Sequence, residues 1–191
     1  MRAAIGSFVS RNAQTLAIAT LALANILLLA QNVGLRSRLA EYAPPEFLES
    51  GDEVPPLRGM DSIGGNVTIE YPAAPATILL FFSPSCRFCE ALFPTWQNVI
   101  PVALERGYRV VGVVRAEESP DGVDEYLERW GVSGMEVVYL SSEALLAYRF
   151  HATPITLAVG PNGVVQNLWV GTWDEDERAE AARFFGVDLG G

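Results

Sequence analysis

The sequence predicts an α/β domain, a mixed central β-sheet flanked by helices, with one transmembrane helix before it. Continuous apolar runs typical of buried strands alternate with amphipathic segments of helical period after residue 76. A tight Pro161-Asn162-Gly163 turn separates the last two strand-like runs, which predicts a hairpin. Strand-helix-strand units give parallel strands and a hairpin gives antiparallel ones, so the sheet should be mixed.

Residues 12–35 are expected to form the membrane anchor. They are 24 uncharged residues between Arg11 and Arg36, and they are apolar on every face rather than along one stripe. At a rise of about 1.5 Å per residue, such a helix crosses the roughly 30 Å hydrocarbon core of a bilayer. A cleavable signal peptide ending at Ala22-Leu23-Ala24 is the alternative, although the apolar run continues beyond that site.

Four segments follow from this anchor. Residues 1–11 are a cytoplasmic stub, 12–35 the anchor, 36–58 a linker rich in proline and acids, and 59–191 the folded domain. The arginines on the two sides of the anchor are nearly balanced, so the positive-inside rule decides little. The chain has two cysteines, both in one motif, which suits an oxidising compartment. We therefore expect a single-pass protein of the cytoplasmic membrane with its domain on the periplasmic side.

The charge distribution excludes several classes of function. All 13 basic residues are arginines, so chemistry that needs lysine, such as Schiff-base formation, is excluded. Every one of the 23 acids lies after residue 38, together with nine of the arginines, which leaves that part of the chain at −14. Such a domain repels nucleic acid and anionic lipid surfaces. Proteins are the expected partners.

The predicted elements of the domain follow in order. Alternation of apolar and polar residues marks a half-exposed strand at 67–71, and a continuous apolar run marks a covered strand at 77–82. Apolar positions then recur every three or four residues in a helix that Pro94 should bend. The full set is strand 67–71, strand 77–82, helix 87–106, strand 109–114, helix 121–130, strand 136–140, helix 142–150, strands 155–159 and 164–170, and helix 174–185. Four acids open the last helix, and we interpret them as caps rather than a metal site.

The chemistry of the chain is expected at Cys86 and Cys89. A strand that delivers Cys-x-x-Cys to the first turn of a helix places the first sulfur where the dipole and free N–H groups favour an anion. This lowers the pKa of that thiol, and the second cysteine, one turn later, can attack a mixed disulfide made by the first. A zinc site needs four ligands, and the chain adds only His151 to the two thiols unless carboxylates take part. A structural disulfide would close a very short loop and gain little.

The order of elements and the motif resemble the thioredoxin fold over about residues 57 to 188. More narrowly, the chain resembles the membrane-anchored TlpA-like thiol-disulfide oxidoreductases. The string SPSCRFCEALFP, with a proline five residues after the second cysteine, is similar to the MauD-like proteins of methylamine utilisation.

The resemblance implies roles for individual residues. Cys86 would be the nucleophile and Cys89 the resolving thiol. Thr153 and Pro154 would form the cis-proline pair that lies against the disulfide, and Thr153 would offer backbone groups to a substrate chain. No metal and no cofactor beyond a redox-active Cys86-Cys89 disulfide is implied.

Other positions of the motif are less constrained. Arg87 and Phe88 are the intervening dipeptide, which tunes reduction potential in this family; Arg87 should favour the thiolate. Ser85 replaces a tryptophan of thioredoxins, so the substrate groove should differ. Leu92 replaces a glutamate of many TlpA-like proteins, which removes a candidate proton acceptor.

The expected function is thiol-disulfide exchange with envelope proteins, as a reductant or maturation factor supplied with electrons by a membrane or envelope redox protein. A Cu(I) metallochaperone using Cys86, Cys89 and His151 is one alternative, since thiolates suit Cu(I). A thiol peroxidase is another, because Ser83 precedes Cys86 by three residues. A scaffold that only retains the fold is disfavoured by the presence of both cysteines and the Thr-Pro pair.

Overall fold

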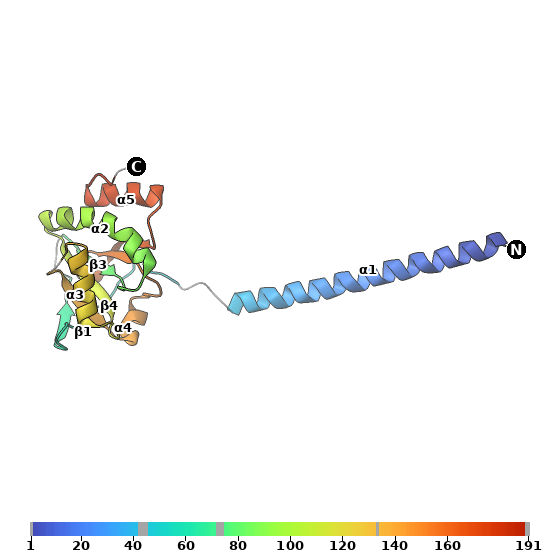
Figure 1. The fold of residues 1–191 in the computed structure, drawn as a ribbon, viewed down its shortest axis with the longest axis horizontal. Helices are drawn as coiled ribbons and strands as arrows, with labels where there is room; N and C mark the ends of the chain where they lie inside the picture. The colour runs from blue at the N-terminus through green and yellow to red at the C-terminus, as the bar shows by residue number, and fades with distance from the viewer. Residues whose placement is uncertain (1, 42–45, 72–74, 133, 190–191) are drawn as a thin grey trace. The chain divides into compact units, whose positions relative to one another are not determined.

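A computed structural model describes residues 2–41, 46–71, 75–132 and 134–189, with side chains described from residue 17 to 36 in the first of these ranges. The chain divides into two units, Met1–Pro44 and Pro45–Gly191. The described residues of the first unit form a single helix, α1, Arg2–Glu41. Figure 1 shows α1 and the elements of the second unit, each of which we describe by itself.

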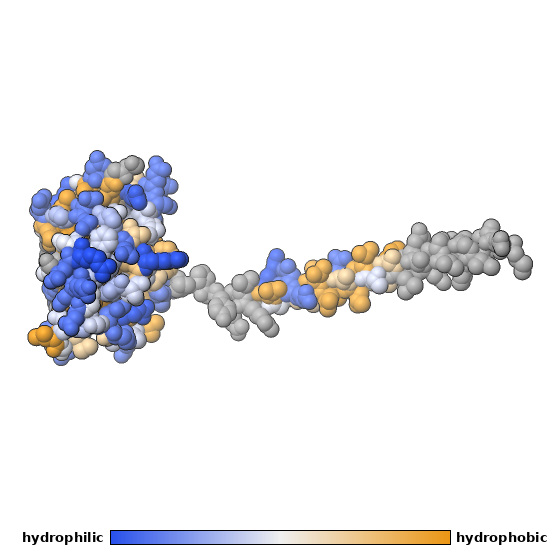
Figure 2. All heavy atoms as spheres, in the orientation of Figure 1, coloured by the Kyte–Doolittle hydropathy of each residue, from blue (hydrophilic) through white to orange (hydrophobic). Residues whose placement is uncertain are grey.

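Helix α1 contains the window Ala17–Arg36, which has a mean hydropathy of 1.8 and no buried side chain. Within the described residues, it is the one helix long and apolar enough to cross a membrane. Figure 2 shows apolar side chains gathered along this part of α1. Thr20 and Asn25 donate side-chain hydrogen bonds of 2.9 Å to the helix's own carbonyls, so these polar groups are satisfied without water. The assignment of 12–35 as a membrane anchor remains a prediction.

The second unit is built on a seven-stranded mixed sheet of order β2-β1-β5-β4-β3-β6-β7. Strand β4 pairs in parallel with β3 and with β5. The other pairings in the sheet are antiparallel. The elements are β1 Leu57–Met60, β2 Asn66–Ile69, β3 Thr77–Phe81, α2 Arg87–Glu105, β4 Arg109–Arg115, α3 Pro120–Arg129, β5 Glu136–Leu140, α4 Ser142–Ala147, β6 Ile155–Val159, β7 Val165–Val170 and α5 Glu175–Phe185. The predicted mixed α/β architecture is confirmed.

Side chains alternate between the two faces of the sheet and form two apolar cores. Ile78 and Leu80 of β3 point into the core shared with α2, α3 and α5, whereas Leu79 and Phe81 point into the core shared with α4. In Figure 1, α2 and α5 run side by side over the first face. The central strands β3 and β6 are buried along their whole length, as their continuous apolar sequences require.

The predicted linker at 36–58 is only partly a linker. Leu48, Val54 and Leu57 are buried in the α4-side core, and the backbone N–H of Val54 donates to the Gly163 carbonyl at 2.8 Å. Strand β1, which the sequence did not predict, pairs with β2 as a hairpin from residue 57. The folded domain therefore begins before residue 59, because a few scattered aliphatic residues complete a core even in a segment rich in proline and acids.

Three local predictions can be compared directly. The helix predicted from residue 87 forms as α2 and continues through Pro94 and Pro101. The bend at Pro94 stays a prediction. The β6–β7 hairpin forms around a short 3-10 turn at Pro161–Gly163. The acids that open α5 do cap it: the Asp174 carboxylate accepts from the Glu177 N–H, and the Glu177 carboxylate accepts from the Asp174 N–H, both at 2.9 Å.

Candidate active site

Cys86 is the N-cap residue of α2, at the carboxyl end of β3. Its backbone is extended, with φ −87° and ψ 110°, and its N–H donates to the Ser83 carbonyl at 3.0 Å, which closes the turn between strand and helix. The sulfur accepts a 3.3 Å hydrogen bond from the backbone N–H of Cys89. The thiol therefore takes the place that a serine or aspartate oxygen usually holds at a helix start, where negative charge is favoured.

Cys89 lies one turn into α2 and is fully buried, whereas Cys86 is half-buried. Both are free thiols. Tyr126 of α3 stacks on Phe82 and meets Phe93 edge to face, with ring centroids 5.7 and 5.3 Å apart, in the same core that holds Cys89. One sulfur is therefore open to a partner and the other is enclosed.

The two thiols have opposite pKa shifts. Burial raises the pKa of Cys86, but hydrogen bonds from the Cys89 thiol, the Thr153 side chain and the N–H groups of Cys89 and Phe88 outweigh it, and the net pKa is lowered. Burial and then the hydrogen bond to Cys86 raise the pKa of Cys89 to about 12. As the pH rises, the half-buried Cys86 thiol therefore ionises before the buried Cys89 thiol.

The peptide bond between Thr153 and Pro154 is cis, and it lies directly against Cys86. The Cys86 thiol donates a 3.4 Å hydrogen bond to the Thr153 carbonyl, which joins residues 67 positions apart. The Pro154 carbonyl in turn accepts from the Gly171 N–H at 2.8 Å, so the loop is held to the end of β7. Pro154 is buried and Thr153 is half-buried beside the sulfur.

The remaining predicted site residues, Ser85, Arg87 and Phe88, lie on the surface next to Cys86. The Arg87 guanidinium lies over the ring of Phe88, 4.7 Å from its centroid, and Phe88 is 49% exposed despite being apolar. Ser85 is exposed just before the helix and pairs its hydroxyl with that of Ser83 at 3.0 Å. The structure thus brings all seven predicted site residues to one place: Ser85, Cys86, Arg87, Phe88, Cys89, Thr153 and Pro154.

A carboxylate that the sequence did not single out also belongs to the site. Ser83 donates a 2.6 Å hydrogen bond to Glu118 Oε1, in the loop between β4 and α3. Parallel pairing of β3 with β4 brings the carboxyl ends of both strands to one edge of the sheet. Knowledge of this pairing would therefore have placed the loop that contains Glu118 beside the cysteines. In the sequence, Glu118 is one of several acids in a polar loop, and nothing there distinguishes it from the others.

Comparison with solved structures identifies the architecture. A DsbE-type putative thiol:disulfide interchange protein from Chlorobium tepidum superposes with a TM-score of 0.58 at 22% identity, covering 75% of this chain and 99% of that one. The thioredoxin domain of a thiol-disulfide oxidoreductase from Bacteroides vulgatus gives 0.56 at 17% identity, covering 72% and 98%. The fold is thioredoxin-like. The thioredoxin fold that the resemblance implied is confirmed.

Curated proteins with sequences similar to this chain include a thiol-disulfide oxidoreductase and a methylamine utilization protein. The thiol-disulfide oxidoreductase ResA of Geobacillus kaustophilus is 25% identical over 99 residues, which are 52% of this chain and 56% of the relative. The methylamine utilization protein MauD of Methylorubrum extorquens is 26% identical over 118 residues, 61% of this chain and 55% of the relative. The chain thus spans about half the length of these curated relatives. No model of a known protein family matches the sequence.

Two residues on which the alternative functions depend, His151 and Ser83, contact other groups in the described structure. His151 is exposed and lies edge-on to Phe47, with ring centroids 6.1 Å apart. In the described part of the chain, no group of three or more His, Cys, Asp or Glu side chains is placed to hold a metal ion. The hydroxyl of Ser83, which suggested a peroxidase, contacts Glu118 and Ser85 instead.

Proposed function

We propose that this chain is a membrane-anchored thiol-disulfide oxidoreductase that exchanges two electrons with disulfides or dithiols of proteins through Cys86 and Cys89. One observation carries the proposal: an accessible thiol of lowered pKa at the start of α2, beside a buried thiol of raised pKa. This asymmetry supports an attacking role for Cys86 and a resolving role for Cys89.

The reaction has two exchange steps. The Cys86 thiolate attacks one sulfur of a partner disulfide, the S–S bond breaks, and the other partner sulfur leaves as a thiolate that takes a proton from water. Cys89 then loses its proton to water and attacks the Cys86 sulfur. The first partner sulfur departs with the electron pair of the broken bond and is protonated. The partner has gained two electrons and two protons, and Cys86 and Cys89 have become a disulfide.

The surface around Cys86 is suited to a polypeptide substrate. Phe88 offers an exposed apolar ring, and Thr153 places backbone groups of the cis-proline loop beside the sulfur. An extended chain can pair with such groups by main-chain hydrogen bonds. The strongly acidic domain disfavours nucleic acid and anionic lipid as partners.

We propose that the protein acts as a reductant or maturation factor for envelope proteins. Each such cycle leaves a Cys86-Cys89 disulfide, so a membrane or envelope redox protein must return two electrons before the next cycle. The apolar window Ala17–Arg36 supports an anchor in the cytoplasmic membrane. Confinement of both cysteines to one motif supports a domain on the extracytoplasmic side, where a stray thiol would be oxidised.

Trapping in native membranes tests this function. In Cys89→Ser, the second step cannot occur, so partners should accumulate as mixed disulfides with Cys86 that disappear on reduction. The matched control is the double variant Cys86→Ser, Cys89→Ser, which should trap nothing. Equal trapping by both variants, or no trapped partner at all, would contradict the proposal. Mass spectrometry of the trapped chains identifies the clients and the compartment they occupy.

A further inference from the structure

Arg149 has a backbone conformation that residues with a side chain rarely adopt. Its φ is 50°, in the left-handed region where glycine is favoured because it has no Cβ. Just after α4, its N–H donates to the Leu146 carbonyl at 3.0 Å, and the Phe150 N–H donates to the Leu145 carbonyl at 2.9 Å. This pair of bonds is the Schellman ending of a helix, which needs a left-handed residue at this position. An arginine here therefore costs free energy that a glycine would not.

The Arg149 side chain links the end of α4 to the segment that leads into the domain. We call residues 46–54 of that segment the strap. The Arg149 guanidinium donates to the Phe47 carbonyl at 3.3 Å and lies 3.4 Å from Asp52 Oδ2. The same carboxylate oxygen accepts from the Glu49 N–H at 3.1 Å, so Asp52 is itself held within the strap. These contacts give the arginine a role that a glycine could not fill.

The strap is fixed to the sheet and can support the residues that bind it. The Gly51 N–H donates to the Val165 carbonyl at 2.9 Å, and the Val165 N–H donates to the Asp52 carbonyl at 2.8 Å. Leu48 and Val54 are buried in the α4-side core. Arg149 is therefore held by a second part of the domain in addition to α4.

The chain after Arg149 runs in a few residues to the Cys86 sulfur. The His151 N–H donates to the Arg149 carbonyl at 3.1 Å, and its ring lies edge-on to Phe47 of the strap, with centroids 6.1 Å apart. Two residues further on, the Thr153 carbonyl accepts from the Cys86 thiol at 3.4 Å. When that thiol loses its proton, the carbonyl becomes available to an N–H group of a client chain.

We propose that Arg149 is a positioning residue for client binding: by linking the strap to the end of α4, it fixes the path of residues 151–153 and hence the direction of the Thr153 backbone groups. The inference rests on the proposed function, in which an extended client pairs with those groups. Arg149 acts through the loop and not by contact with a sulfur. Loss of the link should therefore weaken main-chain pairing and leave the chemistry of Cys86 intact.

Two matched peptides separate pairing from chemistry. Both carry one cysteine joined in a disulfide to thionitrobenzoate, and in one of them the backbone amides beside this cysteine are N-methylated and cannot donate. The Cys86 thiolate attacks the peptide sulfur, the S–S bond breaks, and the coloured thionitrobenzoate leaves with its electron pair. The reduced full chain, in mild detergent, should prefer the unmethylated peptide by about three- to tenfold for each main-chain hydrogen bond formed.

Arg149→Gly is the informative variant, because glycine keeps the left-handed backbone and removes the link. Its preference for the unmethylated peptide should fall by about threefold or more, while its rate with the methylated peptide should stay close to that of the parent chain. Its urea midpoint should also stay close to the parent value, since relief of backbone strain offsets the loss of a partly exposed ion pair. Arg149→Lys restores a cation on a side chain of similar length and should recover most of the preference.

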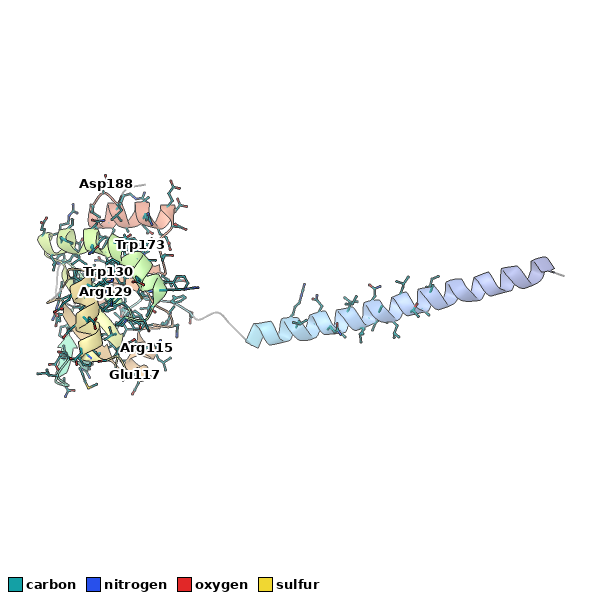
Figure 3. The ribbon with its side chains drawn as sticks, viewed as in Figure 1. Arg115, Glu117, Arg129, Trp130, Trp173 and Asp188 are labelled. Carbon is teal, nitrogen blue, oxygen red and sulfur yellow. The ribbon has the colours of Figure 1, made fainter. Side chains whose placement is uncertain are left out.

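Two further variants complete the test. Asp52→Ala removes the carboxylate end of the link and should lower the preference in the same direction. It replaces Arg149→Gly if that variant does not fold. Arg129, labelled in Figure 3, is an exposed arginine of α3 that also pairs with a carboxylate, that of Glu90, at 3.9 Å. Arg129→Ala removes a surface cation outside the strap and should leave the preference unchanged.

An equal preference in Arg149→Gly and Arg129→Ala would overturn the positioning role alone. A parent chain that reacts with both peptides at one rate would also overturn it, because there would be no main-chain pairing for Arg149 to support. Equal slowing with both peptides in Arg149→Gly would overturn it too, since the effect would then be a general one on Cys86. Absence of thionitrobenzoate release from either peptide by the parent chain would overturn the oxidoreductase itself.

Discussion

The indole N–H of Trp96 donates a 2.8 Å hydrogen bond to the hydroxyl of Thr156, and both side chains are fully buried. Trp96 lies in α2, the helix that starts at Cys86. Thr156 lies in β6, two residues after the cis-proline. This contact joins the two elements that meet at the active site, so we expect it to stabilise both the fold and the geometry of the thiols.

A double-mutant cycle should measure this contact. Trp96→Phe leaves the Thr156 hydroxyl buried without its donor, and we expect it to lower the free energy of unfolding by about 2 to 3 kcal/mol, including the smaller ring. Thr156→Val removes the other partner and should cost about 1 to 2 kcal/mol. The double variant should cost less than the two costs added together, by about 1 kcal/mol, in urea unfolding followed by tryptophan fluorescence. Strict additivity would show that the hydrogen bond contributes nothing.

The segment before β1 should contribute to stability. Leu48 is 6% exposed and packs in the α4-side core, so Leu48→Ala should lower the free energy of unfolding of the full chain by about 2 kcal/mol or more. Ile63 is 90% exposed, and Ile63→Ala should change it by less than about 0.5 kcal/mol. If Leu48→Ala were as neutral as this control, residues before 57 would be a linker after all.

Features that depend on neighbours within a few residues could be predicted from the sequence, whereas contacts between distant segments could not. The Cys-x-x-Cys start of α2, the β6–β7 hairpin and the capped start of α5 depend on neighbours within a few residues, and the sequence predicted them. The docking of Leu48 and the Ser83-Glu118 contact join segments far apart in the chain. Composition and periodicity carry no direct signal for such contacts.

The strand order would have helped to predict one of these contacts, that of Glu118. Once β3 and β4 are taken as parallel neighbours, the loops after both strands must meet at one edge of the sheet. Glu118 then becomes a candidate for the active site on topology alone. Even so, the choice between Glu117 and Glu118 depends on the direction in which each side chain leaves the turn, and the sequence does not specify it.

The first turn of α5 offers a local test of stability. Asp174→Ala removes a carboxylate that accepts from the Glu177 N–H at 2.9 Å and breaks the reciprocal cap. We expect the free energy of unfolding to fall by about 1 kcal/mol. Asp176→Ala removes an acid from the same turn without removing the cap and should cost less than half as much. Equal costs would mean that charge near the helix start, rather than capping, accounts for the acids there.

The pH dependence of alkylation should distinguish the two thiols. Because the pKa of Cys86 is lowered, its reaction with iodoacetamide should rise through a midpoint below that of an ordinary cysteine, whereas Cys89, with a pKa of about 12 and a buried sulfur, should stay unreacted over the same range. Peptide mass spectrometry after quenching at each pH assigns the reacted residue.

Two variants test the cause of that midpoint. Cys89→Ala removes the thiol that hydrogen-bonds to the Cys86 sulfur, so the thiolate loses a donor and the midpoint should move upward. Arg87→Gln removes an exposed cation whose guanidinium lies over the Phe88 ring, and it should move the midpoint less, also upward. A larger shift in Arg87→Gln than in Cys89→Ala would mean that the charge of Arg87, and not the hydrogen bonds at the start of α2, lowers the pKa of Cys86.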